Sequence, residues 1–245
     1  MRNVHPSGEF PDLFLDRLKA IIKLENNPLV IESFRRQKVC SVRVNTIKTS
    51  TDKAIEYFSN SSLSFQKISW SSEVFIFNDV DPSEVSRLDW VSQGNLYIQG
   101  LSSMLPVIVL DPKPGERVLD LCAAPGSKTT QIAALMNNEG EIVAIDSVRP
   151  RFYRLKAVLA LNGVEMARPK CLDGAKYRSS ELFDRILVDA PCSSEARFKM
   201  SDAKTFGYWS LRKIKEMAHK QKGLLLNACR LLKPGGTLVY STCTF

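Results

Sequence analysis

The chain has 245 residues, of which 44% are hydrophobic and 24% are charged. This composition is typical of a globular protein and excludes long disorder, a collagen repeat and a small disulfide scaffold. Lys and Arg number 34 against 26 for Asp and Glu, and this surplus favours a polyanion such as nucleic acid as the partner. The alternative is a basic enzyme without such a partner.

Several protein classes are disfavoured by what the sequence lacks. No apolar run approaches the roughly 20 residues of a membrane helix, and the first residues, MRNVHPSGEFPD, do not form a signal peptide. Two histidines and six well-separated cysteines give no metal-ligand spacing and no Ser/His/Asp triad. We therefore expect a cytoplasmic protein that binds neither membrane nor metal.

The first 94 residues predict a small α+β module. Apolar residues at helical spacing predict helices over 11–25, 27–37 and 50–59, the last with a Ser or Thr cap. Alternating residues predict strands over 40–45, 63–68 and 73–77.

From about residue 95 the chain alternates between strands and helices. We expect strands over 117–121, 141–145, 167–172, 184–188 and 237–240, and helices over 128–136, 151–161 and 211–232, with a turn at 233–236. This alternation predicts an α/β fold with a doubly wound parallel sheet over 95–245. Such sheets bind ligands beyond the carboxyl ends of their strands.

The first of these strands leads into a loop suited to a cofactor. Ala123, Ala124 and Gly126 let a ligand approach the backbone, and the following helix start favours a negative group such as a carboxylate. The loop contains a single glycine, which argues against a P-loop and against a dinucleotide site.

Two acidic residues follow the next two strands. Asp146 suits the hydroxyls of a ribose, and with the single-glycine loop it predicts S-adenosylmethionine (SAM) as the cofactor. Asp173 suits the adenine amine. The alternatives are that Asp146 caps a turn before the next helix and that Asp173 belongs to an Asp-Gly turn.

Cys192 and Cys243 follow strands that should be neighbours in the sheet. Carbon 5 of a pyrimidine accepts a methyl group only after a thiolate adds to carbon 6, so one thiol would be the nucleophile and the other would assist release. Lys128 would lower a thiol pKa through its charge, and Asp189 would hold the base or contact SAM. The remaining thiols at 40, 171 and 229 are expected to be small core residues.

These motifs together resemble the Sun (Fmu) family of RNA cytosine-5 methyltransferases. They occur in the family's order over about residues 91–245, and SVRVNT at 41–46 and YIQGLSSML at 97–105 are similar to earlier family segments. The matching motifs are VLDLCAAPGSKT, AIDSVRPR, Asp173-Gly174, ILVDAPCSS and GGTLVYSTC.

The resemblance implies transfer of a methyl group from SAM to a cytosine of rRNA or tRNA. Cys243 would be the nucleophile, Cys192 would assist breakdown of the adduct, and Asp189 would lie by the methyl donor and the target base. The residues that would cradle SAM are Cys122, Ala123, Ala124, Pro125, Gly126, Ser127 and Lys128. Asp146, supported by Arg151, would bind the ribose, and Asp173 would contact the adenine side.

The resemblance also implies a domain organisation. Residues 1–94 would form an RNA-binding, RRM-like module, and residues 95–245 the Rossmann-like catalytic domain. Family members continue through further strands after the nucleophile, whereas this chain ends two residues after Cys243, so we expect a catalytic domain truncated at its C-terminus.

Residues 196–222 carry eight basic and two acidic side chains, interleaved with aromatic residues. Positive charge would follow RNA phosphates while aromatic rings stack on bases. The expected RNA contacts are Arg197, Lys199, Arg212 and Lys213, with Arg35 and Arg36 as a second patch. The alternative is a solvated helix face whose aromatic residues pack in the core.

Two further readings stay open. A truncated chain would bind SAM and RNA without transferring a methyl group. A DNA cytosine-5 enzyme would use a nucleophile in a Pro-Cys segment, which is Cys192 here. We expect a monomer, and the sequence does not decide between rRNA and tRNA.

Overall fold

The computed structural model describes residues 10–22, 27–36, 39–61, 63–78 and 80–244. The chain forms two compact units. The first unit contains Met1–Lys38, Pro191–Lys222 and Thr242–Phe245, and the second contains Val39–Ala190 and Gly223–Ser241.

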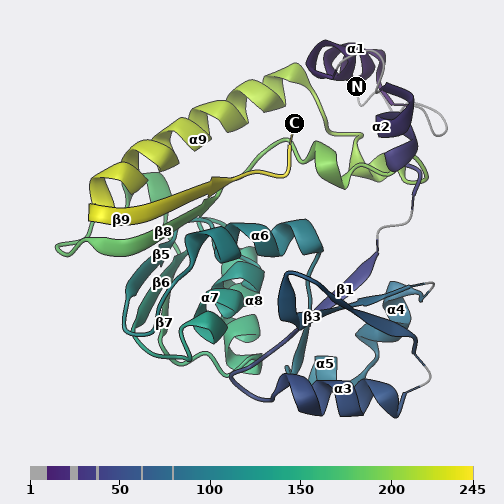
Figure 1. Cartoon of the computed structure of the whole chain (residues 1–245). Coiled ribbons are helices and arrows are strands. Elements are labelled where there is room, and N and C mark those ends of the chain that lie inside the picture. The colour runs from purple at the N-terminus through teal and green to yellow at the C-terminus, as the bar shows by residue number, and fades with distance from the viewer. Residues whose placement is uncertain (1–9, 23–26, 37–38, 62, 79, 245) are drawn as a thin grey trace. The chain divides into compact units, whose positions relative to one another are not determined.

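The second unit contains a five-stranded sheet in the order β7-β6-β5-β8-β9 (Figure 1). All four pairings in this sheet are parallel, as the alternation of strands and helices predicts. The strands are β5 (Arg117–Asp120), β6 (Glu141–Ile145), β7 (Ala167–Lys170), β8 (Phe183–Asp189) and β9 (Leu232–Ser241).

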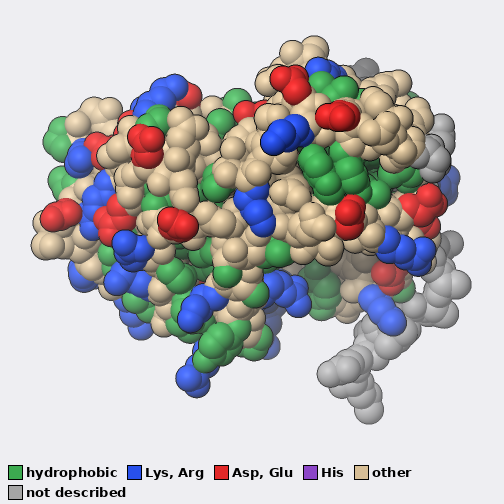
Figure 2. Space-filling view, turned by 90° about the horizontal axis from the view of Figure 1, so that it is seen from below, with side chains coloured by type: hydrophobic (Ala, Val, Ile, Leu, Met, Phe, Trp, Pro, Cys, Tyr) green, Lys and Arg blue, Asp and Glu red, His purple; other side chains and the backbone are tan. Residues whose placement is uncertain are grey.

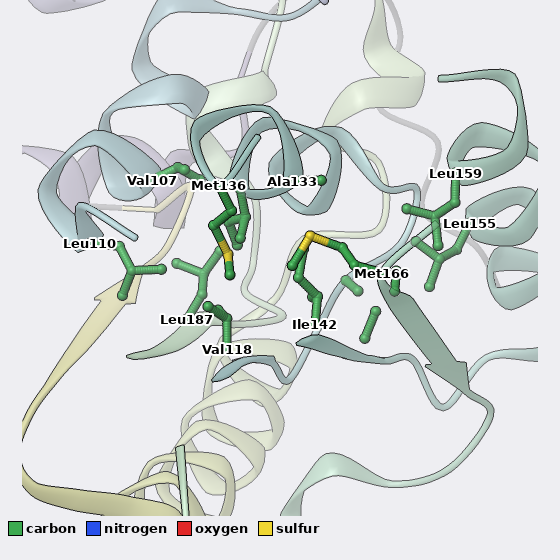
Figure 3. Close-up of a cluster of buried hydrophobic side chains, with 14 of the residues drawn as sticks. Val107, Leu110, Val118, Ala133, Met136, Ile142, Leu155, Leu159, Met166 and Leu187 are labelled. Atoms are coloured by element: carbon green, nitrogen blue, oxygen red, sulfur yellow. The ribbon is translucent and has the colours of Figure 1, made fainter. Parts of the chain in front are cut away.

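Helices pack on both faces of this sheet. In β8, Leu187 belongs to one buried cluster and its neighbours Ile186 and Val188 belong to another, because successive strand residues point to opposite faces. The first cluster takes in α6 (Leu101–Leu110), α7 (Ser127–Leu135) and α8 (Arg149–Leu161), and Figure 3 shows Met136 and Leu155 among its side chains. The second takes in the C-terminal part of α9 (Leu211–Leu231). The doubly wound arrangement is confirmed.

The second unit also contains an antiparallel sheet in the order β2-β3-β1-β4. Its strands are β1 (Cys40–Val44), β2 (Phe65–Ile68), β3 (Ser71–Phe77) and β4 (Leu96–Ile98), with helices α3 (Thr51–Ser59), α4 (Pro82–Ser86) and α5 (Asp89–Ser92). The Ser50 side chain accepts a hydrogen bond from the Lys53 amide and caps α3, as predicted. Helices α4 to α6 and strand β4 were not predicted. Because β4 pairs with β1, this sheet extends past residue 94, and the domain boundary there stays a prediction.

The prediction of a turn at 233–236 is wrong, because these residues lie within β9. The register against β8 shifts between Phe183 and Arg185, and Gly235 has a φ of 79°. Pro234 has no amide proton, which a strand at the edge of a sheet tolerates.

The first unit has an aromatic core. It contains α1 (Asp12–Ile21), α2 (Asn27–Ser33), the short 3-10 helices Glu195–Arg197 and Ala203–Thr205, and the N-terminal part of α9. The buried aromatic residues of this core are Phe10, Phe14, Phe34, Phe198, Phe206 and Trp209. The predicted helices over 11–25 and 27–37 include residues 23–25 and 37, which lie outside the described residues.

Candidate functional site

The predicted cofactor loop lies in the second unit, between the end of β5 at Asp120 and the start of α7 at Ser127. Gly126, the residue before α7, has a φ of 115°. A Cβ atom at this position would lie 2.9 Å from Val158 Cγ1 and 3.1 Å from Leu155 Cδ1 of α8. The loop therefore needs glycine here for both its conformation and its close approach to α8.

Asp146 follows β6 and is joined to this loop through Arg151. One carboxylate oxygen accepts a hydrogen bond from the Val148 amide at 2.9 Å, so the turn alternative describes part of its role. The other lies 3.2 Å from Arg151 Nη2, which also donates to the Ala124 carbonyl at 2.5 Å. Arg151 thus connects the buried Asp146 to the cofactor loop, while their contact with a cofactor stays a prediction.

The loop is surrounded by carboxylates. Asp120 is 1% exposed and accepts from the Thr129 hydroxyl at 2.8 Å, and burial raises the pKa of Asp120 to about 6. Burial, and then the charges of Asp120, Asp146 and Asp189, raise the pKa of the Cys122 thiol. The Cys122 thiol therefore stays protonated, and the acidic surroundings favour a ligand that carries positive charge. Asp120 was missed as a site residue, although its position at the end of β5 was a usable signal.

Lys128 and Asp189 form an ion pair in the second unit. Lys128 is buried, and its Nζ lies 2.6 Å from Asp189 Oδ2 and 3.0 Å from Ser103 Oγ. The other Asp189 oxygen accepts from the Ser241 hydroxyl at 2.8 Å. The charge of Lys128 is therefore balanced by Asp189, and its effect on a thiol stays a prediction. Ser103 and Ser241 were not predicted as site residues.

Asp173 is exposed and accepts a hydrogen bond from the Ala175 amide at 3.0 Å. This contact starts the 3-10 helix Gly174–Lys176, so the turn alternative accounts for its local structure. Its contact with adenine stays a prediction.

Cys192 and Cys243 lie together in the first unit, with their Sγ atoms 3.0 Å apart. The Cys243 amide donates to Cys192 Sγ at 3.3 Å, and Ser194 Oγ lies 3.5 Å from Cys243 Sγ. The hydrogen bond with Cys243 is the largest cause that raises the pKa of Cys192, followed by burial. The strands that precede the two cysteines, β8 and β9, are neighbours as predicted.

The other cysteines differ from our expectation. Cys40 is buried as predicted, but Cys171 and Cys229 are exposed, so their assignment to the core is wrong. Cys171 directly follows β7, a strand at the edge of the sheet, and Cys229 lies on α9 beside the buried Ala228.

Glu195 connects the two segments that carry the thiols. It is 4% exposed and accepts from Trp209 Nε1 at 2.8 Å and from the Thr244 hydroxyl. The Ala196 amide donates to the Cys243 carbonyl at 3.2 Å. Sequence reasoning missed Glu195, because only the fold shows that its neighbours are residues 209 and 244.

The family model for 16S rRNA methyltransferase RsmB/F matches residues 107–245. The chain belongs to this family. A tRNA (cytosine(49)-C(5))-methyltransferase of Pyrococcus abyssi is 43% identical over 83% of this chain. A ribosomal RNA small subunit methyltransferase F of Vibrio parahaemolyticus is 37% identical over 98% of it. The chain spans 65% and 52% of the length of these two relatives.

The fold of this RsmB/F family member is also found in solved structures. The crystal structure of a methyltransferase homolog protein from Pyrococcus horikoshii has a TM-score of 0.83 and 33% sequence identity, and it covers 96% of this chain and 73% of that chain. The sheet topology and this likeness show a Rossmann-like methyltransferase fold.

In the basic segment 196–222, most of the aromatic residues are buried. Phe198, Phe206 and Trp209 pack in the core of the first unit, as the alternative interpretation holds, and only Tyr208 is exposed, at 55%. The prediction that these three buried rings stack on RNA bases is therefore wrong.

The predicted RNA-contact residues are all exposed or partly exposed to solvent. Arg197, Lys199, Arg212, Arg35 and Arg36 are exposed, and Lys213 is partly exposed. Arg212 forms an ion pair with Glu216 of the same helix, α9. Arg35, which follows α2, forms one with Glu32 of α2. On the face drawn in Figure 2, blue Lys and Arg side chains lie scattered among red Asp and Glu side chains. RNA contacts of these residues stay predictions.

The described part of the chain holds no group of three or more His, Cys, Asp or Glu side chains placed to bind a metal ion. None of its helices combines the length and the apolar character needed to cross a bilayer.

Proposed function

We propose that this chain carries the catalytic centre of a SAM-dependent RNA (cytosine-5) methyltransferase that acts on rRNA or tRNA. The observation that carries the proposal is the contact between the thiols of Cys192 and Cys243. Methylation at carbon 5 of cytosine needs one thiol to activate the ring and a second group to help release it. Membership of the RsmB/F family and the names of both relatives support this reaction.

The two thiols have different roles in this proposal. The Cys243 thiolate adds to carbon 6 of cytosine, and carbon 5 then has the electron density to take a methyl group. Afterwards the proton at carbon 5 leaves and the Cys243–carbon 6 bond breaks, with Cys192 assisting this release. The raised pKa of Cys192 supports the assignment, because a thiol that stays protonated is a poor nucleophile.

The charge around the cofactor loop supports SAM as the ligand. The carboxylates of Asp120, Asp146 and Asp189 surround the Cys122 thiol, and such acidic surroundings suit the positive sulfonium group. When bound, SAM supplies the methyl group. The residues proposed to hold it are Cys122, Ala123, Ala124, Pro125, Gly126, Ser127, Lys128, Asp146, Arg151, Asp173 and Asp189.

We assign residues 1–94 to an RNA-binding, RRM-like module and residues 95–245 to the catalytic domain. RNA is proposed to contact the exposed Tyr208 and the basic side chains of Arg197, Lys199, Arg212, Lys213, Arg35 and Arg36. We further propose that the protein works as a monomer in the cytoplasm, where rRNA and tRNA substrates occur.

Transfer of labelled methyl groups from SAM to separate rRNA and tRNA pools tests the proposal. Digestion of the RNA to nucleosides should show the label in 5-methylcytosine, and the pool that carries it identifies the substrate class. Binding of SAM without labelling of either pool would instead support a protein that binds without catalysing. Label in another nucleoside would assign a different reaction.

A further inference from the structure

Arg43 of β1 is a buried arginine in the second unit that contacts the helix after the cofactor loop. It is 2% exposed, and its Nη2 donates to Thr130 Oγ1 of α7 at 2.9 Å. Its Nε donates to Gln99 Oε1 at 3.2 Å. Nη1 is buried and has no hydrogen-bond partner among the residues that the structure describes.

Thr130 belongs to the first turn of α7. Its amide donates to the Gly126 carbonyl at 2.8 Å, and its hydroxyl donates to the Ser127 carbonyl at 3.0 Å. The hydroxyl that accepts from Arg43 therefore also holds the end of the cofactor loop. A change at Arg43 therefore reaches Gly126 and Ser127 through one residue, Thr130.

Gln99 extends the same contacts to the other side of Lys128. Its Nε2 donates to Gln131 Oε1 at 2.9 Å and to the Ser103 carbonyl at 3.3 Å. Ser103 Oγ in turn accepts from Lys128 Nζ. Arg43 and Gln99 thus contact both the helix turn that contains Lys128 and the residue that binds its ammonium group.

Stability of the fold alone does not explain a buried arginine with an unpaired nitrogen. Burial lowers the pKa of Arg43 to about 10, against the opposing effects of Glu73 and Tyr97. Removing a guanidinium from water is unfavourable, and well-packed apolar residues often replace buried ionic groups without loss of stability. A role in fixing one arrangement of neighbouring groups accounts for its presence better.

We propose that Arg43 is a positioning residue for SAM. Arg43 sets the conformation of the first turn of α7 through the Thr130 hydroxyl. This inference rests on the proposed function. Arg43 itself does not touch the cofactor. It holds the carbonyls and amides at 126–128 in the arrangement that receives the ligand, so its loss weakens binding of SAM rather than the chemical step.

The test measures binding of S-adenosylhomocysteine to the full chain by titration calorimetry. The variants are Arg43→Met, Thr130→Val, which removes the hydroxyl at similar volume, and Thr130→Ser, which keeps it. We expect the dissociation constant to rise about fivefold or more for Arg43→Met and Thr130→Val, and to stay near the parent value for Thr130→Ser. The double variant should bind S-adenosylhomocysteine no more weakly than the single variant that binds it less tightly, because both changes remove the same contact.

A second readout separates positioning from support of the fold. In steady-state transfer, KM for SAM should rise with kcat little changed, and circular dichroism should show folded protein at the assay temperature. Lower thermal midpoints with unchanged S-adenosylhomocysteine affinity would assign Arg43 to the fold alone and overturn the inference. Failure of the parent to bind S-adenosylhomocysteine would overturn the proposed function as well, so the two failures are distinct.

Discussion

Lys128 Nζ lies 2.6 Å from Asp189 Oδ2, although the two residues are 61 positions apart in the chain. Lys128 is in the first turn of α7, after β5, and Asp189 is the last residue of β8, which pairs with β5 in parallel. The ion pair therefore joins the carboxyl ends of two neighbouring strands.

Replacing Lys128 with Met should destabilise the second unit. Lys128 is mostly buried and Asp189 is about one third exposed, so the unpaired carboxylate loses only part of its solvation. We expect the free energy of unfolding to fall by about 1–3 kcal/mol, measured by urea denaturation.

The double variant Lys128→Met/Asp189→Asn is the control for this prediction. Its loss of unfolding free energy should be smaller than the sum of the losses in the two single variants, because the buried charge and its partner are removed together. Strict additivity would show that the pair contributes no coupling energy.

Asp120 should make the protein less stable as the pH rises from about 4 to about 6. Its pKa is about 6 in the folded chain, against about 3.9 for an unperturbed Asp, so between these values the folded state binds more protons than the unfolded state. The unfolding free energy should fall by up to about 3 kcal/mol across this window.

Asp120→Asn should remove this contribution, since the amide does not titrate and its oxygen can accept from Thr129. Chemical denaturation of parent and variant at several pH values measures the difference. Carboxyls with lowered pKa, such as Asp184, affect both proteins alike and cancel in the comparison. Parallel pH curves for the two proteins would contradict the assignment.

Phe206 and Tyr208 offer a matched pair for the role of the aromatic residues in the basic segment 196–222. Phe206 is 2% exposed and packs against Phe10 with ring centroids 5.0 Å apart, whereas Tyr208 is 55% exposed. Phe206→Ala should lower the unfolding free energy of the first unit by about 3–5 kcal/mol, and Tyr208→Ala by less than about 0.5 kcal/mol.

RNA binding should show the opposite order for folded protein. Tyr208→Ala should weaken RNA binding by about 1–3 kcal/mol, the usual contribution of one stacked base, as measured by fluorescence anisotropy. Unchanged RNA affinity for Tyr208→Ala would leave phosphate contacts as the source of binding.

The parallel sheet and the residues at its strand ends could be predicted because each is local in the sequence. A buried strand, a short loop and a polar side chain follow one another in the segments around Asp146 and Asp189. The order of the strands and their motifs also predicted that β8 and β9 are neighbours in the sheet. This prediction placed the two cysteines after adjacent strands.

The relationships that were missed depend on residues far apart in the chain. The packing of the N-terminal helices with residues 198–209 requires long-range aromatic contacts that have no spacing signal. The same is true of the Arg43–Thr130 and Lys128–Ser103 hydrogen bonds. Basic and aromatic residues at helical spacing fit an RNA surface and a buried core equally well, so only the fold could decide which rings are buried.

The covalent step is tested most directly by trapping the enzyme on RNA. The parent, Cys243→Ala and Cys192→Ala would be incubated with SAM and RNA and run on a denaturing gel with labelled RNA. The proposal predicts a persistent protein–RNA adduct for Cys192→Ala and none for Cys243→Ala, with 5-methylcytosine formed by the parent. An adduct for Cys243→Ala and none for Cys192→Ala would make Cys192 the nucleophile and contradict the assigned roles.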